Sequence, residues 1–366
     1  MLTFRILWAG SVLLALGAPA VAYDVNEQYS IGGVIAGSMQ CQTLSEKAGA
    51  DNECAGALPL QPEVSFRPTE RDELFVKFGF ASGNGLNDKS PFVLAPWAAD
   101  LHDDVKDING SGRDYLLTAW YQHTFTLRKD STLGATIGII DATDYLDDNT
   151  YSNDEYTQFM NEALVNGPNA FLPSYDTGGA LVWNTGPWSL RGVVMKVNEN
   201  DDGNNFTFYA AQLGYTLQSG LGEGNYRVLV NRASEDFLDE NGQSEHKRAS
   251  ILLSFDQQLG DVVGAFLRIG WQNDDAAVNY DAIWSGGINI TGSPWKRADD
   301  NIGIGYAYLD GGNLDISQSQ VAEAYYRFVI NDNLALSADI QYMKDNLRNQ
   351  ENPTGFIYGL RLTAEF

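Results

Sequence analysis

The last twelve residues, Gly355 to Phe366 (GFIYGLRLTAEF), constrain the fold of this chain most. From Phe356 to Phe366 every second residue is apolar or aromatic, whereas the positions between them include Arg361 and Glu365. A period of two is typical of a β-strand whose two faces meet different surroundings. A strand with lipid on one side and water on the other has this pattern, and so does a strand of a soluble β-sandwich. The rest of the chain has to decide between them.

The same alternation recurs along the chain and predicts about 16 strands, an even number as in single-chain outer-membrane barrels. They are expected near residues 29–39, 62–68, 72–80, 115–125, 131–141, 178–184, 188–198, 205–217, 224–234, 246–256, 262–273, 280–288, 300–309, 321–330, 334–344 and 356–366. Aromatic residues gather at strand ends, as interfacial girdles do, and short links at 128–130, 185–187 and 331–333 alternate with long ones. The pattern predicts an all-β, transmembrane antiparallel β-barrel with inward-folded or long outer loops.

The strand faces opposite the apolar ones carry charges in mid-strand. A dry protein core does not tolerate unpaired charges, but a water-filled lumen hydrates them. By their position in the alternation these side chains point into the bore: Lys77, Arg191, Arg227, Arg268, Glu323, Arg327, Asp339, Arg361 and Glu365. Trp120 and Tyr325 fall on the same faces. This distribution favours a barrel over a sandwich.

The N-terminus predicts export. Arg5 precedes an apolar run from Ile6 to Leu16, and Ala20-Val21-Ala22 has the small residues of a cleavage site. We expect residues 1–22 to be a signal peptide and residues 23–366 to form a single outer-membrane β-barrel domain, the alternative being an N-terminal membrane anchor. Cys41 and Cys54, the only cysteines, are expected to form a disulfide worth on the order of 3 kcal/mol.

Composition excludes several function classes. The 23 Lys+Arg against 48 Asp+Glu give a net charge of -25, which argues against nucleic-acid partners. The three histidines, His102, His123 and His246, have no metal-ligand spacing, and no catalytic motif or cofactor signature is present. Acidic loops could bind a divalent cation, but solvated loops explain them as well. We therefore expect neither an enzyme nor a metal or cofactor site.

Two connections are too long for plain loops, from about residue 82 to 113 and from about 141 to 178. In the second, Asp154 is expected to cap a helix over 155–165, with Phe159, Met160, Ala163 and Leu164 on one face. Long segments of this kind either fold inward and narrow the bore or form surface loops.

The stretch from Asp141 to Asn184 resembles the carbohydrate-selective outer-membrane porins of the OprB type. An aspartate-rich run, a short helix and a glycine-rich restart occur in the same order, and the matching residues are Asp141, Asp144, Tyr145, Asn149, Phe159, Asn161, Ala163, Leu164 and Pro173. The resemblance covers essentially the chain after residue 22. It implies a 16-stranded barrel in the outer membrane that admits neutral sugars by diffusion.

We accordingly expect a water-filled channel that passes mono- or small oligosaccharides into the periplasm. The pore-wall residues expected to bind sugar are Arg191, Arg227, Arg268, Arg327, Arg361, Glu323, Asp339 and Trp120. Alternatively, these charges only balance one another, and the chain is a general or cation-preferring porin; a plugged adhesin or structural barrel is a third class. Expected partners are sugars, outer-membrane lipid and lipopolysaccharide, with the monomer and the homotrimer both open.

Overall fold

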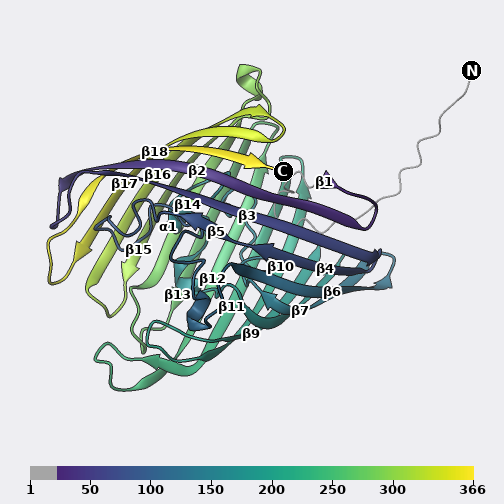
Figure 1. Cartoon of the computed structure of the whole chain (residues 1–366), viewed down its shortest axis with the longest axis horizontal. Helices are drawn as coiled ribbons and strands as arrows, with labels where there is room; N and C mark the ends of the chain where they lie inside the picture. Colours follow the sequence, from purple (N-terminus) through teal and green to yellow (C-terminus); the bar gives the residue numbers. More distant parts are fainter. Residues whose placement is uncertain (1–22) are drawn as a thin grey trace, which may run out of the picture.

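The computed structural model describes residues 23–366, and these form an almost all-β molecule (Figure 1). The predicted signal peptide, residues 1–22, lies outside the described residues. Among the residues described, no helix is long and apolar enough to cross a membrane.

The first strands in chain order are β1 (Tyr23–Asp24), β2 (Tyr29–Glu46), β3 (Cys54–Thr69), β4 (Asp72–Phe78), β5 (Phe80–Ser82), β6 (Leu116–Arg128) and β7 (Ser131–Ile140). The others are β8 (Asp176–Thr185), β9 (Trp188–Val197), β10 (Phe206–Ser219), β11 (Gly222–Leu238), β12 (Glu245–Leu259), β13 (Val263–Gln272), β14 (Tyr280–Thr291), β15 (Asn301–Gly311), β16 (Ile316–Asn331), β17 (Leu334–Leu347) and β18 (Thr354–Glu365). The helical turns are η1 (Ile108–Gly110), α1 (Glu162–Val165), η2 (Pro168–Ala170) and η3 (Ser293–Trp295).

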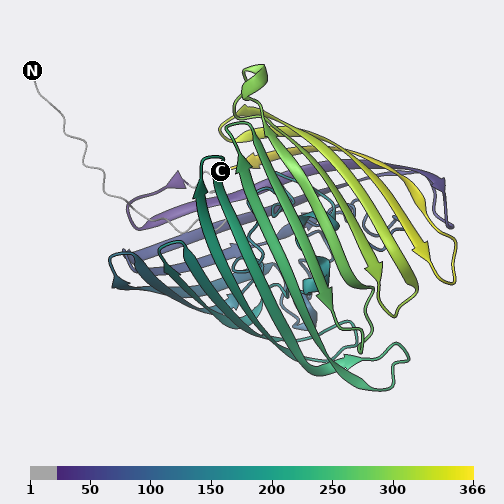
Figure 2. The same cartoon turned by 180° about the vertical axis from the view of Figure 1, so that it is seen from behind.

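The sheet closes on itself through its first and last long strands. β18 pairs with β2, and at the seam Phe366 N donates to Gly33 O (3.0 Å) while Gly33 N donates to Phe366 O (2.9 Å). β4 and β5 both pair with β3 and form one strand interrupted at Gly79, while β1 is a two-residue partner of β2. The result is a closed 16-stranded antiparallel barrel, which confirms the predicted fold (Figure 2).

The two faces of β18 are separated as the alternation predicts. Phe356, Leu360 and Leu362 are 42%, 57% and 47% exposed on the outside, whereas Ile357 and Arg361 point inward and have no exposed area. Exposed apolar side chains also cover the outside of the other strands. An apolar outer band around a polar interior is the arrangement of a membrane-spanning barrel.

The two ends of the barrel differ. The short turns between β6 and β7, β8 and β9, and β16 and β17 lie at the same end as the C-terminus, which corresponds to the periplasmic end of such barrels. At the other end, the extracellular end, the strands run beyond the predicted ranges, β2 as far as Glu46 and β11 as far as Leu238. Polar residues stand on both faces there, as Gln42 and Thr43 of β2 do, so hydrophobic alternation no longer marks the strand.

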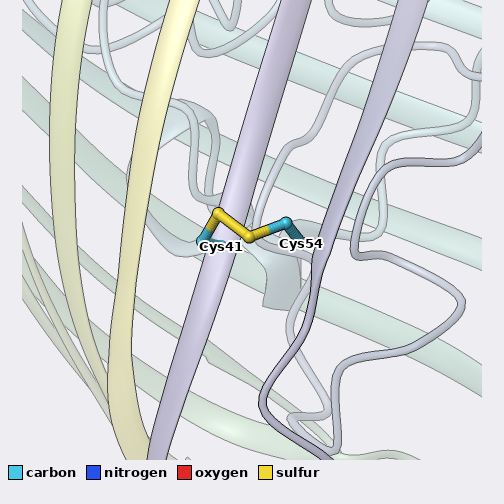
Figure 3. Close-up of a disulfide and its surroundings, with 2 residues drawn as sticks. All are labelled: Cys41 and Cys54. Atoms are coloured by element: carbon cyan, nitrogen blue, oxygen red, sulfur yellow. A yellow bond between two sulfur atoms is a disulfide. The ribbon is translucent and has the colours of Figure 1, made fainter.

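The predicted disulfide is present at the extracellular end. Cys41 and Cys54 lie directly opposite each other on β2 and β3, with their Cα atoms 4.0 Å apart (Figure 3). The bond therefore joins two neighbouring barrel strands close to the loop that connects them.

Candidate functional site

Two segments fold into the barrel and fill much of its bore. The first inward segment, residues 83–115, connects β5 to β6; the second inward segment, residues 141–175, connects β7 to β8 and carries α1 (Figure 1). They contact each other, since Ala98 N donates to Met160 O (2.8 Å) and Trp97 Nε1 donates to Glu155 O (2.9 Å). The prediction of inward folding is confirmed, and the alternative of external surface loops is wrong.

Arg268, on β13, anchors the second inward segment through a fully buried ion pair. Its Nε lies 2.8 Å from Asp147 Oδ1, and neither side chain has any exposed area. Its two terminal nitrogens donate to the hydroxyl and the carbonyl oxygen of Ser152. Since a buried charge without a partner is costly, this pairing fixes the segment against β13.

A second carboxylate, Asp148, extends this anchor to neighbouring strands. Arg191 of β9 and Arg227 of β11 donate to its two oxygens at 2.7 Å and 2.8 Å. Arg227 also pairs with Asp256 of β12 at 2.6 Å. We call Arg191, Arg227 and Arg268, together with Asp147 and Asp148, the arginine clamp. It holds one point of the segment to strands β9–β13.

Strands β16 and β18 hold the middle of the segment by its backbone. Arg361, on β18, donates to the carbonyl oxygens of Glu155 (2.6 Å) and Gln158 (2.8 Å). The carboxylate of Glu323, on β16, accepts the backbone N–H groups of Met160 (2.6 Å) and Asn161 (3.0 Å). The segment therefore crosses the bore from β9–β13 to β16–β18.

These wall contacts correct the predicted helix over 155–165. Only α1, Glu162–Val165, is helical, and its N-cap is Asn161, whose side chain accepts from Ala163 N. Asp154 does cap a turn, because its Oδ1 accepts from Tyr156 N at 2.7 Å. The helix is shorter because Arg361 and Glu323 occupy backbone groups that would otherwise bond within it.

Several predicted pore-wall residues point inward as expected but do not face open water. Arg268 and Arg361 have no exposed area, and Glu323 and Asp339 are only 2% and 6% exposed. The expectation that these four side chains line the open bore is corrected, because the second inward segment covers them. The motif residues of that segment, Tyr145, Phe159 and Asn161, are likewise buried, with Phe159 packed on the rings of Phe266 and Tyr325.

The other predicted residues occupy less enclosed positions. The Arg191 and Arg227 side chains keep 11% and 8% exposure within the clamp. Arg327 pairs with Glu365 at 3.1 Å near the periplasmic end. Trp120 is half-buried on β6. Their contact with sugar stays a prediction.

Half-buried polar and aromatic groups lie together on the inner side of β3, β4 and β6. Glu63 and Lys77 are directly opposite each other on β3 and β4, and in the neighbouring row Phe75 is opposite Trp120. The Phe75 and Trp120 rings are stacked with centroids 4.9 Å apart. Gly138 of β7 pairs with Trp120, and a Cβ there would meet Ala119 O at 2.3 Å, so the strand passes close behind the indole only because this residue is glycine.

Carboxylates of the inward segments face this wall. Asp144 and Asp100 are half-buried and interact electrostatically with Lys77. Gln61 Nε2 and Tyr175 OH each donate to Asp100 Oδ2 at 2.6 Å. Burial, and then the neighbouring Asp144, raise the pKa of Asp141 to about 7. Together these groups form a site, the β3–β6 site, with one cation, several carboxylates and an aromatic face.

Sequence reasoning found only part of this site. Alternation along the strands predicts that Lys77 and Trp120 point inward. The same alternation applied to Glu63 and Phe75 would have predicted that they point inward as well. Asp100 lies in a connection without periodicity, so no sequence signal marks it. Across residues 23–366 no group of three or more His, Cys, Asp or Glu side chains is arranged to hold a metal ion.

A closed barrel with an apolar outside, a polar bore and long segments that narrow the bore from within defines a porin. The chain belongs to the OprB family of carbohydrate-selective porins, which its residues 81–366 match. This confirms the resemblance seen in the Asp141–Asn184 stretch.

Individual relatives agree with this assignment. An uncharacterized protein of Aquifex aeolicus is 31% identical over 301 residues, which cover 80% of this chain and 84% of the relative. Among solved structures, the high-pH structure of Pseudomonas putida OprB has a TM-score of 0.74 at 15% identity and covers 93% of this chain and 94% of its own. The low-pH structure of the same protein has a TM-score of 0.58 at 13% identity, with 93% of both chains covered. At these identities the structural matches establish the fold.

Proposed function

We propose that sugars cross the bore through the β3–β6 site. As a member of its family, the chain is an outer-membrane carbohydrate channel. The observation that favours this route is the stacked pair of Phe75 and Trp120 beside the polar row of Glu63 and Lys77. An aromatic ring accommodates the apolar face of a sugar, while charged groups exchange hydrogen bonds with its hydroxyls. The bore contributes binding and passage, with no chemical step.

The test compares two phenylalanines of β4 that differ in the direction they face. Phe75→Ala and Trp120→Ala remove the inner aromatic face, whereas Phe78→Ala removes a ring that is 39% exposed on the outside of the same strand. We expect the inner variants to weaken sugar block of the ionic current about fivefold, the order of an aromatic contact of about 1 kcal/mol. Phe78→Ala should block like wild type.

The measurement is single-channel conductance in planar bilayers titrated with mono- and oligosaccharides, supported by liposome swelling. Wild-type channels whose conductance does not respond to any saccharide would contradict the sugar route. Equal sugar block in the inner variants and in Phe78→Ala would mean that the Phe75–Trp120 pair does not contribute to sugar binding.

A second function, a cation-preferring channel, is favoured by the charges of the same site. Asp100, Asp141, Asp144 and Glu63 surround the single cation Lys77. Acidic groups around a narrow bore favour cations. Reversal potentials in a KCl gradient measure this preference, and strong cation selectivity without sugar block would make it the main function.

A further inference from the structure

A groove runs along the lipid-facing outside of β8–β11. Its floor consists of the small outward residues Gly179, Gly192 and Ala211, and its sides include Leu181, Val194, Tyr209 and Val230. The hollow measures about 500 Å³. Small residues between large exposed apolar ones leave a channel into which a flexible hydrocarbon chain can settle.

Two cations stand at the extracellular end of this groove. Arg232 of β11 lies directly opposite Tyr209 of β10. Lys196 of β9 lies directly opposite Thr207, which is the next outward residue of β10 toward the extracellular end. Both cationic residues are exposed. They flank β10 from either side, two strand spacings across and two residues along, or roughly 12 Å apart, so their long side chains can reach one headgroup above Tyr209.

The described outward positions that line the groove carry no acidic side chain beside these cations. The outward positions of β8, β9 and β10 next to the groove, and those of β11 from Val228 to Arg232, include neither Asp nor Glu. This is unusual for a chain with a net charge of -25. A second hollow of about 500 Å³, outside β2, β3, β17 and β18, provides a contrast, because its lining, which includes Met39, Leu58 and Leu360, contains no charged residue.

We propose that the β8–β11 groove is a specific site for a phosphate-bearing lipid of the outer leaflet, of the lipid A type. One acyl chain occupies the hollow over Gly192, and the phosphate pairs with Lys196 and Arg232. Arginine and lysine bind phosphate strongly at an interface, whereas a lipid without phosphate gains only the apolar contact. The other hollow offers the apolar contact alone and is expected to exchange lipids without preference.

The test uses purified full-length mature protein in detergent, titrated with lipid A and followed by native mass spectrometry. We expect wild type to retain one lipid A, and Lys196→Gln/Arg232→Gln to bind it about thirty-fold more weakly, as for the loss of two cations near a lipid surface. Gly192→Leu keeps both charges and fills the hollow; a Cβ there meets only Ala210 O at 3.9 Å, so the barrel tolerates it. This variant should also lose lipid A.

Three controls make the result decisive. The charge-conserving exchange Lys196→Arg/Arg232→Lys should bind like wild type, and Lys344→Gln, which removes an outward cation of β17 outside the groove, should have no effect. Dephosphorylated lipid A should bind wild type as weakly as the double Gln variant binds lipid A. Unaltered channel conductance in bilayers verifies that each variant is folded.

Two outcomes would overturn the proposal. One is equal lipid A binding by wild type, the double Gln variant and Gly192→Leu, which would mean a non-specific lipid shell. The other is a stable assembly of several copies in which a cysteine placed at Leu181 cross-links to its equivalent, which would mean that a second copy of the chain covers the groove.

Discussion

Charged side chains in the bore have two different roles, which their surroundings distinguish. Arg268 and Arg361 are fully enclosed and use their donors on the second inward segment. Lys77 is half-buried on the inner wall without such a contact to the segment's backbone. Alternation in the sequence gives the direction of each side chain but not its partner, because the partners Asp147, Ser152 and Glu155 lie in a connection outside the strands.

At this scale we predict that Arg268→Ala loosens the narrowed bore. The substitution leaves Asp147 buried without its charge partner. This destabilises the docked conformation of the second inward segment by about 3–5 kcal/mol. The barrel strands keep their own pairing, so we expect a folded channel with higher conductance and faster proteolysis within residues 141–175. Planar-bilayer recordings and limited proteolysis followed by mass spectrometry measure both effects.

Arg327→Ala is the matched control, since it removes another inward arginine whose partner is Glu365 rather than the inward segments. It should leave conductance and cleavage within residues 141–175 nearly unchanged. If the two variants behave alike, the pair of Arg268 and Asp147 does not hold the segment.

Among the elements, the second inward segment shows where local sequence and tertiary structure conflict. Its apolar positions Phe159, Met160, Ala163 and Leu164 are all buried, as the predicted helical face requires. Its helix is nevertheless a single turn, because the barrel wall bonds to the backbone of the preceding residues. A prediction from local pattern identifies the buried positions correctly but cannot include acceptors that lie more than 160 residues away.

The start of this segment also predicts a pH dependence. With a pKa of about 7, Asp141 is mainly neutral at pH 5 and mainly ionised at pH 9, so the negative charge of the bore increases as the pH rises. Asp144, Asp100 and Glu63 add to that charge, and Lys77 opposes it. We expect the preference for K⁺ over Cl⁻ to increase between pH 6 and 8, as measured by reversal potential. In Asp141→Asn the increase in cation preference over this pH range should be much smaller. If the variant and wild type have the same pH dependence, another group is responsible for the increase.

For the whole molecule, the sequence contains most of the information on the barrel. All 16 predicted strands are present, and the pairing of β18 with β2 closes them into the predicted barrel. The extracellular extensions of the strands were not predictable, because polar residues on both faces remove the hydrophobic contrast on which alternation depends. The residues that the strands contribute to the β3–β6 site were predictable from alternation. The residues that the inward segments contribute were not, because these segments fold against the completed barrel wall.

Barrel closure makes the C-terminal residue important for assembly. Phe366 exchanges two backbone hydrogen bonds with Gly33 and places an exposed ring at the periplasmic end. We expect deletion of Phe366 to lower the yield of inserted barrel severalfold while the channels that form keep wild-type conductance and sugar block. Heat-modifiable migration on gels gives the yield, and bilayer recordings give the selectivity. Normal insertion of the deletion variant would contradict this role.

The position of Arg361 on the last strand has a consequence for the order of events during biogenesis. The second inward segment is synthesised well before β18, yet two of its carbonyl oxygens are held by that strand. The molecular sieve can therefore be completed only after the final hairpin is in place, whatever the order in which the earlier strands assemble. A nascent barrel would be an unfiltered opening, and cells gain from a seam that closes quickly once the last strand arrives.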